Sequence, residues 1–157
     1  MSLLRRLPAD VRKALPTEPG ERVLTFAASG EGYMVATDLA LYLADGSRLP
    51  YETIDKAAWD EEGVRVLTTD GVVHRAEVTD PRRMPETVRE RVNATIVVNK
   101  HVQLPGRGGV RLVARRSPGG DVKEWTLVFD EGLDPNDPGV RAQAEQALEG
   151  VRRSMGV

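Results

Sequence analysis

The side chains of this sequence that could do acid–base or metal chemistry are few and far apart. The chain has two histidines, His74 and His101, and no cysteine. Each histidine lies in an alternating pattern typical of a strand, and neither has a second histidine or a carboxylate at metal-ligand spacing. No nucleophile-elbow motif presents a serine or threonine. We therefore predict no metal site, no cofactor and no catalytic residues, and the sequence favours a protein that is not an enzyme.

Two loops have the composition of ligand sites but not their spacing. The segment Gly106-Arg107-Gly108-Gly109 is rich in glycine, yet it lacks the lysine and hydroxyl of a phosphate loop and lies between two predicted strands. Residues 130–139 are acidic enough for a calcium loop, but Pro138 stands at the fifth ligand position. Both loops are interpreted as connections between elements.

A run of mostly basic side chains is the candidate ligand-binding surface. Arg111 and Arg115 share one face of a predicted strand with Val113. The segment lacks the interleaved aromatic side chains of sheets that stack nucleotide bases, which disfavours nucleic acid as a partner. A solvated face, or one paired with acidic groups of the same chain, remains the simpler alternative. The candidate residues are Lys100, His101, Arg107, Arg111 and Arg115.

The charges are segregated along the chain although the whole carries a net charge of only −2. Residues 23–81 carry eleven acidic and four basic side chains, and residues 82–123 carry three acidic and ten basic ones. Because segments that are neighbours in sequence usually pack together, we expect these charges to complement one another within the chain. Self-association, or an anionic partner, is the alternative.

Composition and apolar runs predict a cytoplasmic protein. The chain has 157 residues, 40% of them hydrophobic, which is enough for a buried core. No apolar run approaches the length of a membrane span, so we expect no stable membrane insertion. The first residues contain only Leu3-Leu4 before two arginines and resemble no signal peptide. The absence of cysteine fits a reducing compartment.

The periodicity predicts an α+β fold made of antiparallel β meanders, with a short middle helix and a packed C-terminal helix. Leu4, Leu7, Val11 and Leu15 predict an amphipathic helix whose docking the sequence leaves open. Asp45-Gly46 and Asp70-Gly71 predict hairpin turns. The expected divisions are 1–20 for the N-terminal helix and linker and 21–157 for one domain, which consists of a meander over 21–80, a helix over 81–93, a second meander over 94–130 and a helix over 137–155.

The last helix has the clearest signals. Asp137 is predicted as its N-cap and Pro138 as a residue of its first turn. One apolar stripe is expected to face the second meander and consists of Val140, Ala144, Ala147, Leu148, Val151 and Met155.

One segment resembles a known family. Thr37-Asp38-Leu39-Ala40-Leu41, followed by Pro50-Tyr51-Glu52-Thr53-Ile54, is similar to bacterial pleckstrin-homology-like domains over about residues 21–80. The chain also resembles an uncharacterised family of small actinobacterial proteins through this segment and through Leu104–Val110. The first resemblance implies a bent antiparallel barrel closed by a C-terminal helix and used to bind proteins, peptides or lipids.

These patterns together predict a non-enzymatic binding or adaptor module for a protein or peptide, whose partner is an unknown protein or a second copy of the chain. One alternative is a small-molecule binder or enzyme with a cleft between the meanders, lined by Lys100, His101 and Arg111. Another is weak binding of anionic polymers or a membrane surface through residues 107–116 and the N-terminal helix.

Overall fold

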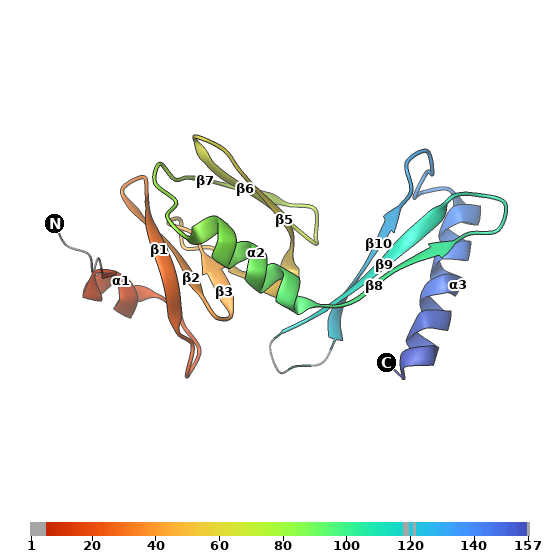
Figure 1. Cartoon of the computed structure of the whole chain (residues 1–157), viewed down its shortest axis with the longest axis horizontal. Helices are drawn as coiled ribbons and strands as arrows, with labels where there is room; N and C mark the ends of the chain where they lie inside the picture. The colour runs from red at the N-terminus through yellow and green to blue at the C-terminus, as the bar shows by residue number, and fades with distance from the viewer. Residues whose placement is uncertain (1–5, 118–119, 121, 157) are drawn as a thin grey trace. The chain divides into compact units, whose positions relative to one another are not determined.

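Ten strands and three α-helices make up the described part of the chain, which in the computed structural model is residues 6–117, 120 and 122–156. The chain divides into two units with the boundary between Ala94 and Thr95. Unit 1 is the part up to Ala94, and unit 2 is the part from Thr95 onwards (Figure 1). The range 21–157, expected from the sequence to be one domain, spans both units.

The first four strands of unit 1 form an antiparallel sheet in chain order. The turn at Asp45-Gly46 matches its prediction, because Gly46 adopts a φ of 94° and the Asp45 carboxylate accepts a hydrogen bond from the Ser47 N–H at 2.9 Å. The last strand has three residues and no periodic signal, which is why the sequence did not reveal it. The strands are β1 (Val23–Ser29), β2 (Gly32–Thr37), β3 (Ala40–Tyr42) and β4 (Arg48–Pro50).

A second antiparallel sheet of unit 1 contains β5 (Ile54–Trp59), β6 (Gly63–Thr68) and β7 (Val73–Glu77), in that order. The predicted turn at Asp70-Gly71 joins the last two strands, with a φ of 87° at Gly71. The strand β5 begins at Ile54, directly after a 3-10 turn formed by Tyr51–Thr53. The helix expected over 81–93 is α2 (Met84–Thr95).

Both sheets of unit 1 and α2 bury one common core. Cross-strand pairs join Ala36 to Leu41 and Leu41 to Leu49, so these side chains share the inner face of the four-stranded sheet. Val66 from β6 and Val88 from α2 belong to the same cluster. The described strands form separate sheets and not a closed barrel, which departs from the barrel that the resemblance implies.

The N-terminal segment covers the other face of the four-stranded sheet. Leu7 is buried, and Val11 and Leu15 are half-buried, in a cluster with Val35 and Tyr42. The helix α1 (Ala9–Ala14) begins directly after Pro8, its N-cap residue, and ends before Leu15. Residues 1–5, including Leu4, lie outside the described residues. The helix therefore docks its apolar side on the sheet.

Unit 2 is a three-stranded antiparallel sheet with one helix packed against it. Its strands are β8 (Ile96–Gln103), β9 (Gly109–Arg116) and β10 (Val122–Phe129), and β9 lies in the centre. The core lies between one face of this sheet and α3 (Pro138–Met155), and it includes Leu112, Ala114 and Ala144 (Figure 1). The α+β class with antiparallel meanders and a packed C-terminal helix is thereby confirmed.

The cap and stripe predicted for α3 are confirmed except at its end. The Asp137 carboxylate accepts hydrogen bonds from the N–H groups of Gly139 at 2.8 Å and Val140 at 3.3 Å. Val140, Ala144 and Val151 are buried, and Ala147 and Leu148 are half-buried in the same cluster. Met155 is 46% exposed, because it is the last residue of the helix and lies one turn beyond Val151.

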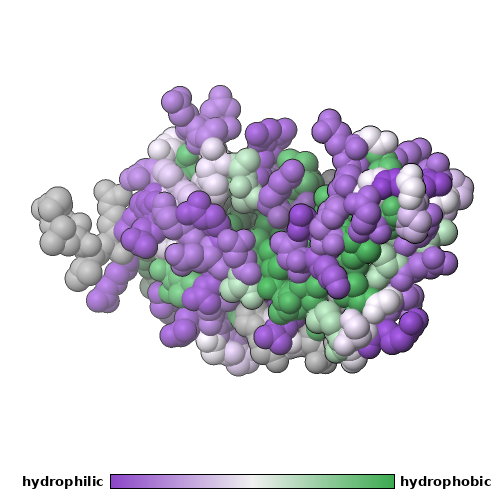
Figure 2. Space-filling view, turned by 45° about the vertical axis from the view of Figure 1, so that its right-hand side comes forward, coloured by the Kyte–Doolittle hydropathy of each residue, from purple (hydrophilic) through white to green (hydrophobic). Residues whose placement is uncertain are grey.

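Hydrophilic side chains cover most of the face shown in Figure 2, and apolar side chains reach the surface between them. Among the described residues the exposed large apolar side chains are those of Leu24, Val72, Val73, Val97, Val128 and Met155. None of the described helices combines the length and the apolar character that crossing a membrane requires.

Candidate functional site

The five side chains that the sequence singles out lie on unit 2 but do not form one patch. His101 pairs with Arg111 across β8 and β9, whereas Lys100 pairs with Leu112, a residue of the core beneath α3. Because successive side chains of a strand point to opposite faces, Lys100 lies on the helix side of the sheet and His101 on the other. Of the three residues proposed to line a common cleft, Lys100 is therefore separated from His101 and Arg111.

The remaining basic residues of the candidate set are engaged individually. Arg107, in the turn between β8 and β9, lies 3.8 Å from the carboxylate of Asp137. Arg111 donates to the side-chain oxygen of Asn99 at 2.7 Å. Arg115 is 3% exposed and donates to the hydroxyl of Thr126 at 3.0 Å. These contacts favour the interpretation of local pairing over that of an open basic surface.

His101 has a partner that the sequence did not reveal. Its Nε2 lies 2.9 Å and 3.2 Å from the two carboxylate oxygens of Asp130, a residue 29 positions away at the end of β10. The same carboxylate accepts a hydrogen bond from the Gly109 N–H at 2.6 Å. The pair thus reaches from one edge strand of the sheet to the other, across β9.

Because Gly109 has no side chain, it leaves room for the contact between His101 and Asp130 across β9. A Cβ at this position would lie 2.3 Å from His101 Cε1, 2.5 Å from its Nε2 and 2.8 Å from the carbonyl oxygen of Val102. Real Cβ atoms do not approach other heavy atoms so closely, so any larger residue would displace the imidazole. The glycine that resembled part of a phosphate loop therefore leaves room for a side chain of its own sheet.

The electrostatics of the pair fit a positioning role. The Gly109 N–H first, and then His101, hold the pKa of Asp130 below its usual value by hydrogen bonding to the charged carboxylate. No group of three or more histidine, aspartate or glutamate side chains comes together among the described residues. The contact between the His101 ring and the Asp130 carboxylate joins the two edge strands of the sheet.

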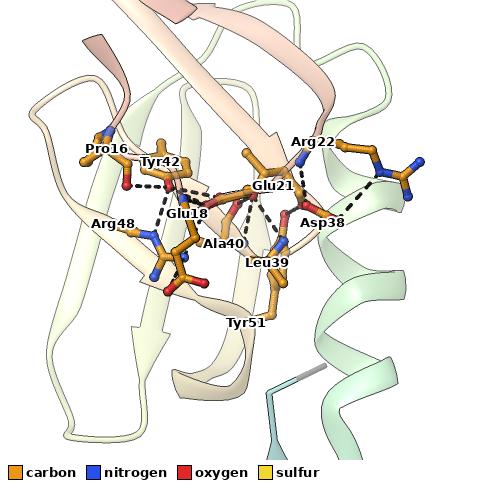
Figure 3. A network of polar contacts seen from close by, with 11 residues as sticks. Pro16, Glu18, Glu21, Arg22, Asp38, Leu39, Ala40, Tyr42, Arg48 and Tyr51 are labelled. Carbon is orange, nitrogen blue, oxygen red and sulfur yellow. Dashed lines mark hydrogen bonds and ion pairs between the residues drawn. The ribbon is translucent and has the colours of Figure 1, made fainter. Parts of the chain in front are cut away.

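A second polar network lies in unit 1 around Glu21, whose side chain has no exposed surface. Figure 3 shows that its partners come from the linker and from the four-stranded sheet. Its carboxylate accepts hydrogen bonds from the Thr37 hydroxyl, the Tyr42 hydroxyl at 2.9 Å and the Glu18 N–H at 2.9 Å. The Arg48 guanidinium lies 3.5 Å away. The linker is thus tied to β2, β3 and β4.

The Tyr42 hydroxyl is the centre of this network. It accepts a hydrogen bond from Arg48 Nε at 2.9 Å while it donates to Glu21, and the carbonyl oxygen of Pro16 lies 3.4 Å away. Burial alone would raise the pKa of Glu21, but the hydrogen bonds from Thr37, Glu18 and Tyr42, together with the charge of Arg48, hold it below the usual value. The buried carboxylate of Glu21 therefore holds the linker against the sheet.

A cleft beside β5 is the best-formed candidate for binding a partner. It has a volume of about 250 Å³ and lies between β5 and α2 within unit 1. Its apolar lining includes Ala57 and Trp59 from the strand and Val88 and Val92 from the helix. Charged side chains of Asp55, Lys56 and Arg89 complete it. Residues of β5 line this cleft, and β5 is an edge strand of its sheet, which pairs with β6 alone among the described strands.

The sequence contains signals for only some of the residues that line the cleft beside β5. The spacing of Val88 and Val92 marks the inward face of α2, and alternation along β5 places Ala57 with Trp59. That the helix lies next to this strand depends on how the two sheets pack, and no local pattern records it.

Comparison with known proteins identifies no relative of this chain. Neither a protein-family model, nor a curated protein, nor a solved structure matches the chain.

Proposed function

We propose that the protein is a non-enzymatic binding module that holds an extended segment of a partner protein along β5, in the cleft beside α2. The observation that carries this proposal is an apolar cleft beside β5, an edge strand that pairs with β6 alone among the described strands. An extended peptide can add to such an edge as a further strand, and its alternate side chains then enter the neighbouring pockets.

The size of the cleft favours a peptide side chain over a metabolite. Pockets for small molecules usually enclose about 300–1,000 Å³ and surround most of their ligand. The cleft beside β5 has about 250 Å³, which suits one or two side chains of a bound segment. Trp59 and Val92 at its wall favour an apolar anchor residue.

The charges of the cleft narrow the class of peptide. Lys56 and Arg89 are exposed at its rim, against one acidic side chain, Asp55. An acidic residue next to the apolar anchor would therefore meet complementary charge. We expect a segment that combines an apolar side chain with a neighbouring aspartate or glutamate.

Two further observations support a binding role. Two carboxylates with several partners, Glu21 and Asp130, accept hydrogen bonds from backbone N–H groups and hold segments of the chain in place. In addition, residues 21–80 resemble pleckstrin-homology-like domains in sequence, and that resemblance implies binding of proteins, peptides or lipids.

Site-specific crosslinking tests the proposal. A photoreactive amino acid at Lys56, which is exposed at the cleft, should capture one partner protein in the native cells, and the crosslinked fragment should contain an apolar residue beside an acidic one. The matched control is Arg75, equally exposed on β7 at the opposite edge of the same sheet. Equal capture from both positions, or capture from neither, would overturn the proposal.

A synthetic peptide that spans the crosslinked fragment allows a quantitative check. Reversing one rim charge, either with Lys56→Glu or with Arg89→Glu, should weaken the binding of this peptide by about tenfold, because complementary charge becomes like charge. Arg75→Glu makes the same change of charge away from the cleft and should leave the affinity unchanged. Dependence on Arg75, or none on the rim pair, would locate the peptide elsewhere.

A further inference from the structure

A second pocket of unit 1 lies on the side of the four-stranded sheet that carries the N-terminal segment. It has a volume of about 560 Å³ and is lined by three arginines, Arg6, Arg12 and Arg82, that come from two distant parts of the sequence. Thr25 contributes a hydroxyl, and Phe26 is part of the apolar wall. No acidic side chain lines the pocket.

The three arginines bring positive charge to β1, although the segment that contains this strand is acidic. Residues 23–81 have a net charge of −7, and two other arginines of unit 1 form ion pairs, Arg22 with Asp38 and Arg48 with Glu21. Among the described residues, none forms an ion pair with the three arginines of the pocket. Their charge is therefore available to a ligand.

Arg82 is held in place by two unusual features. Its φ of 56° is the only positive value at a non-glycine position in the described chain. Its guanidinium carbon lies 5.1 Å from the centroid of the Phe26 ring, within the range of a cation–π contact. A residue remains in a sparsely populated conformation only when its surroundings impose it, and such residues gather at ligand sites. Here the strained backbone directs a cation towards the pocket.

We propose that this pocket binds a phosphate monoester. A guanidinium offers a planar fork of N–H donors that matches the oxygens of a phosphate. The positive charge of the three arginines together is larger than the single negative charge of a carboxylate. A phosphate monoester carries a charge close to −2 at neutral pH and three strong acceptor oxygens. The apolar wall formed by Leu24 and Phe26 would contact the group that bears the phosphate. This site is separate from the cleft beside β5 and does not depend on the peptide proposal.

Titrations with glycerol phosphate and with acetate test the ligand class on the full chain, with the arginine Nε–H signals followed by NMR. The phosphate should shift the signals of Arg12 and Arg82, and acetate at equal concentration should have a much smaller effect. Vesicles of phosphatidylcholine with and without phosphatidic acid distinguish a soluble source from a lipid headgroup. Binding to either phosphate source supports the site, and binding to neither overturns it.

Two variants and a control separate binding from folding. Arg82→Gly removes the guanidinium at a position where glycine adopts the positive φ without strain, so the protein should remain folded and lose about tenfold or more in phosphate affinity. Arg12→Gln should act in the same direction. Arg83→Ala removes a neighbouring exposed arginine that does not line the pocket, and it should leave the affinity unchanged. Equal losses in all three variants would indicate unspecific attraction and overturn the proposal.

Discussion

Glu21 in unit 1 and Asp130 in unit 2 are carboxylates with similar tasks in different surroundings. Each accepts hydrogen bonds from segments that are distant in the sequence, and each has a pKa below its usual value. The side chain of Glu21 has no exposed surface, whereas that of Asp130 is 40% exposed. A buried carboxylate cannot replace a lost partner with water, but an exposed one can. We therefore expect unit 1 to depend on its network far more strongly than unit 2 depends on its pair.

The largest effect is expected from Glu21→Gln. The substitution leaves the hydroxyls of Thr37 and Tyr42 without their charged acceptor in a buried site, and it should reduce the free energy of unfolding by about 3 kcal/mol. Denaturation by urea measures the change. Glu18→Gln, at a side chain that is 64% exposed, is the matched control and should be nearly neutral. Similar losses in both variants would contradict the comparison.

A smaller effect is expected from Gly109→Ala in unit 2. The added Cβ would displace the His101 ring and press on the carbonyl oxygen of Val102, at a cost of about 2 kcal/mol from overpacking. Urea denaturation gives the loss, and NMR should show a changed environment for the His101 ring. His101→Ala removes the contact without adding an atom and should cost less than Gly109→Ala. If Gly109→Ala leaves the stability and the His101 ring signals unchanged, His101 and Asp130 do not contact each other across β9 in solution.

The smallest effect is the dependence on pH of the stability that each of the two carboxylates contributes. The folded pKa of Glu21 lies below its unfolded value, so its contribution is complete above the unfolded value of about 4.3 and is lost as pH falls through the folded pKa. The stability difference between the wild type and Glu21→Gln should therefore shrink under acid. Asp130 titrates with the same sign, so Asp130→Asn provides a second profile. A difference that stays constant between neutral pH and pH 3 would mean that Glu21 is not charged in the folded protein.

The elements that the sequence predicts correctly have signals within a few neighbouring residues. Asp70-Gly71 forms its hairpin turn and Asp137 caps α3, because each side chain acts on backbone groups two or three positions away. The alternation along β8 already separated Lys100 from His101, although both had been assigned to one surface. β4 carries no such signal, since three residues are too few for a period to show.

The candidate sites depend on contacts between residues that are far apart in the sequence. Tyr42 is 21 residues from Glu21, and Asp130 is 29 residues from His101. Each pair forms only after the sheet register has brought two segments together, and a shift of one residue would place the partners on opposite faces. The three arginines of the phosphate pocket likewise come from the N-terminal segment and from the connection between β7 and α2.

By itself the sequence determined the class of fold, most of the turns, the cap and apolar stripe of α3, and the scarcity of groups for catalysis. These follow from turn chemistry, capping and periodicity, which operate over a few residues along the chain. Only the tertiary structure decided that the N-terminal helix docks its apolar side on the four-stranded sheet, that Glu21 ties the linker to this sheet, that Gly109 makes room for His101, and that a cleft lies beside β5. Packing and register join residues that the chain keeps far apart, and no local pattern specifies which of them will meet.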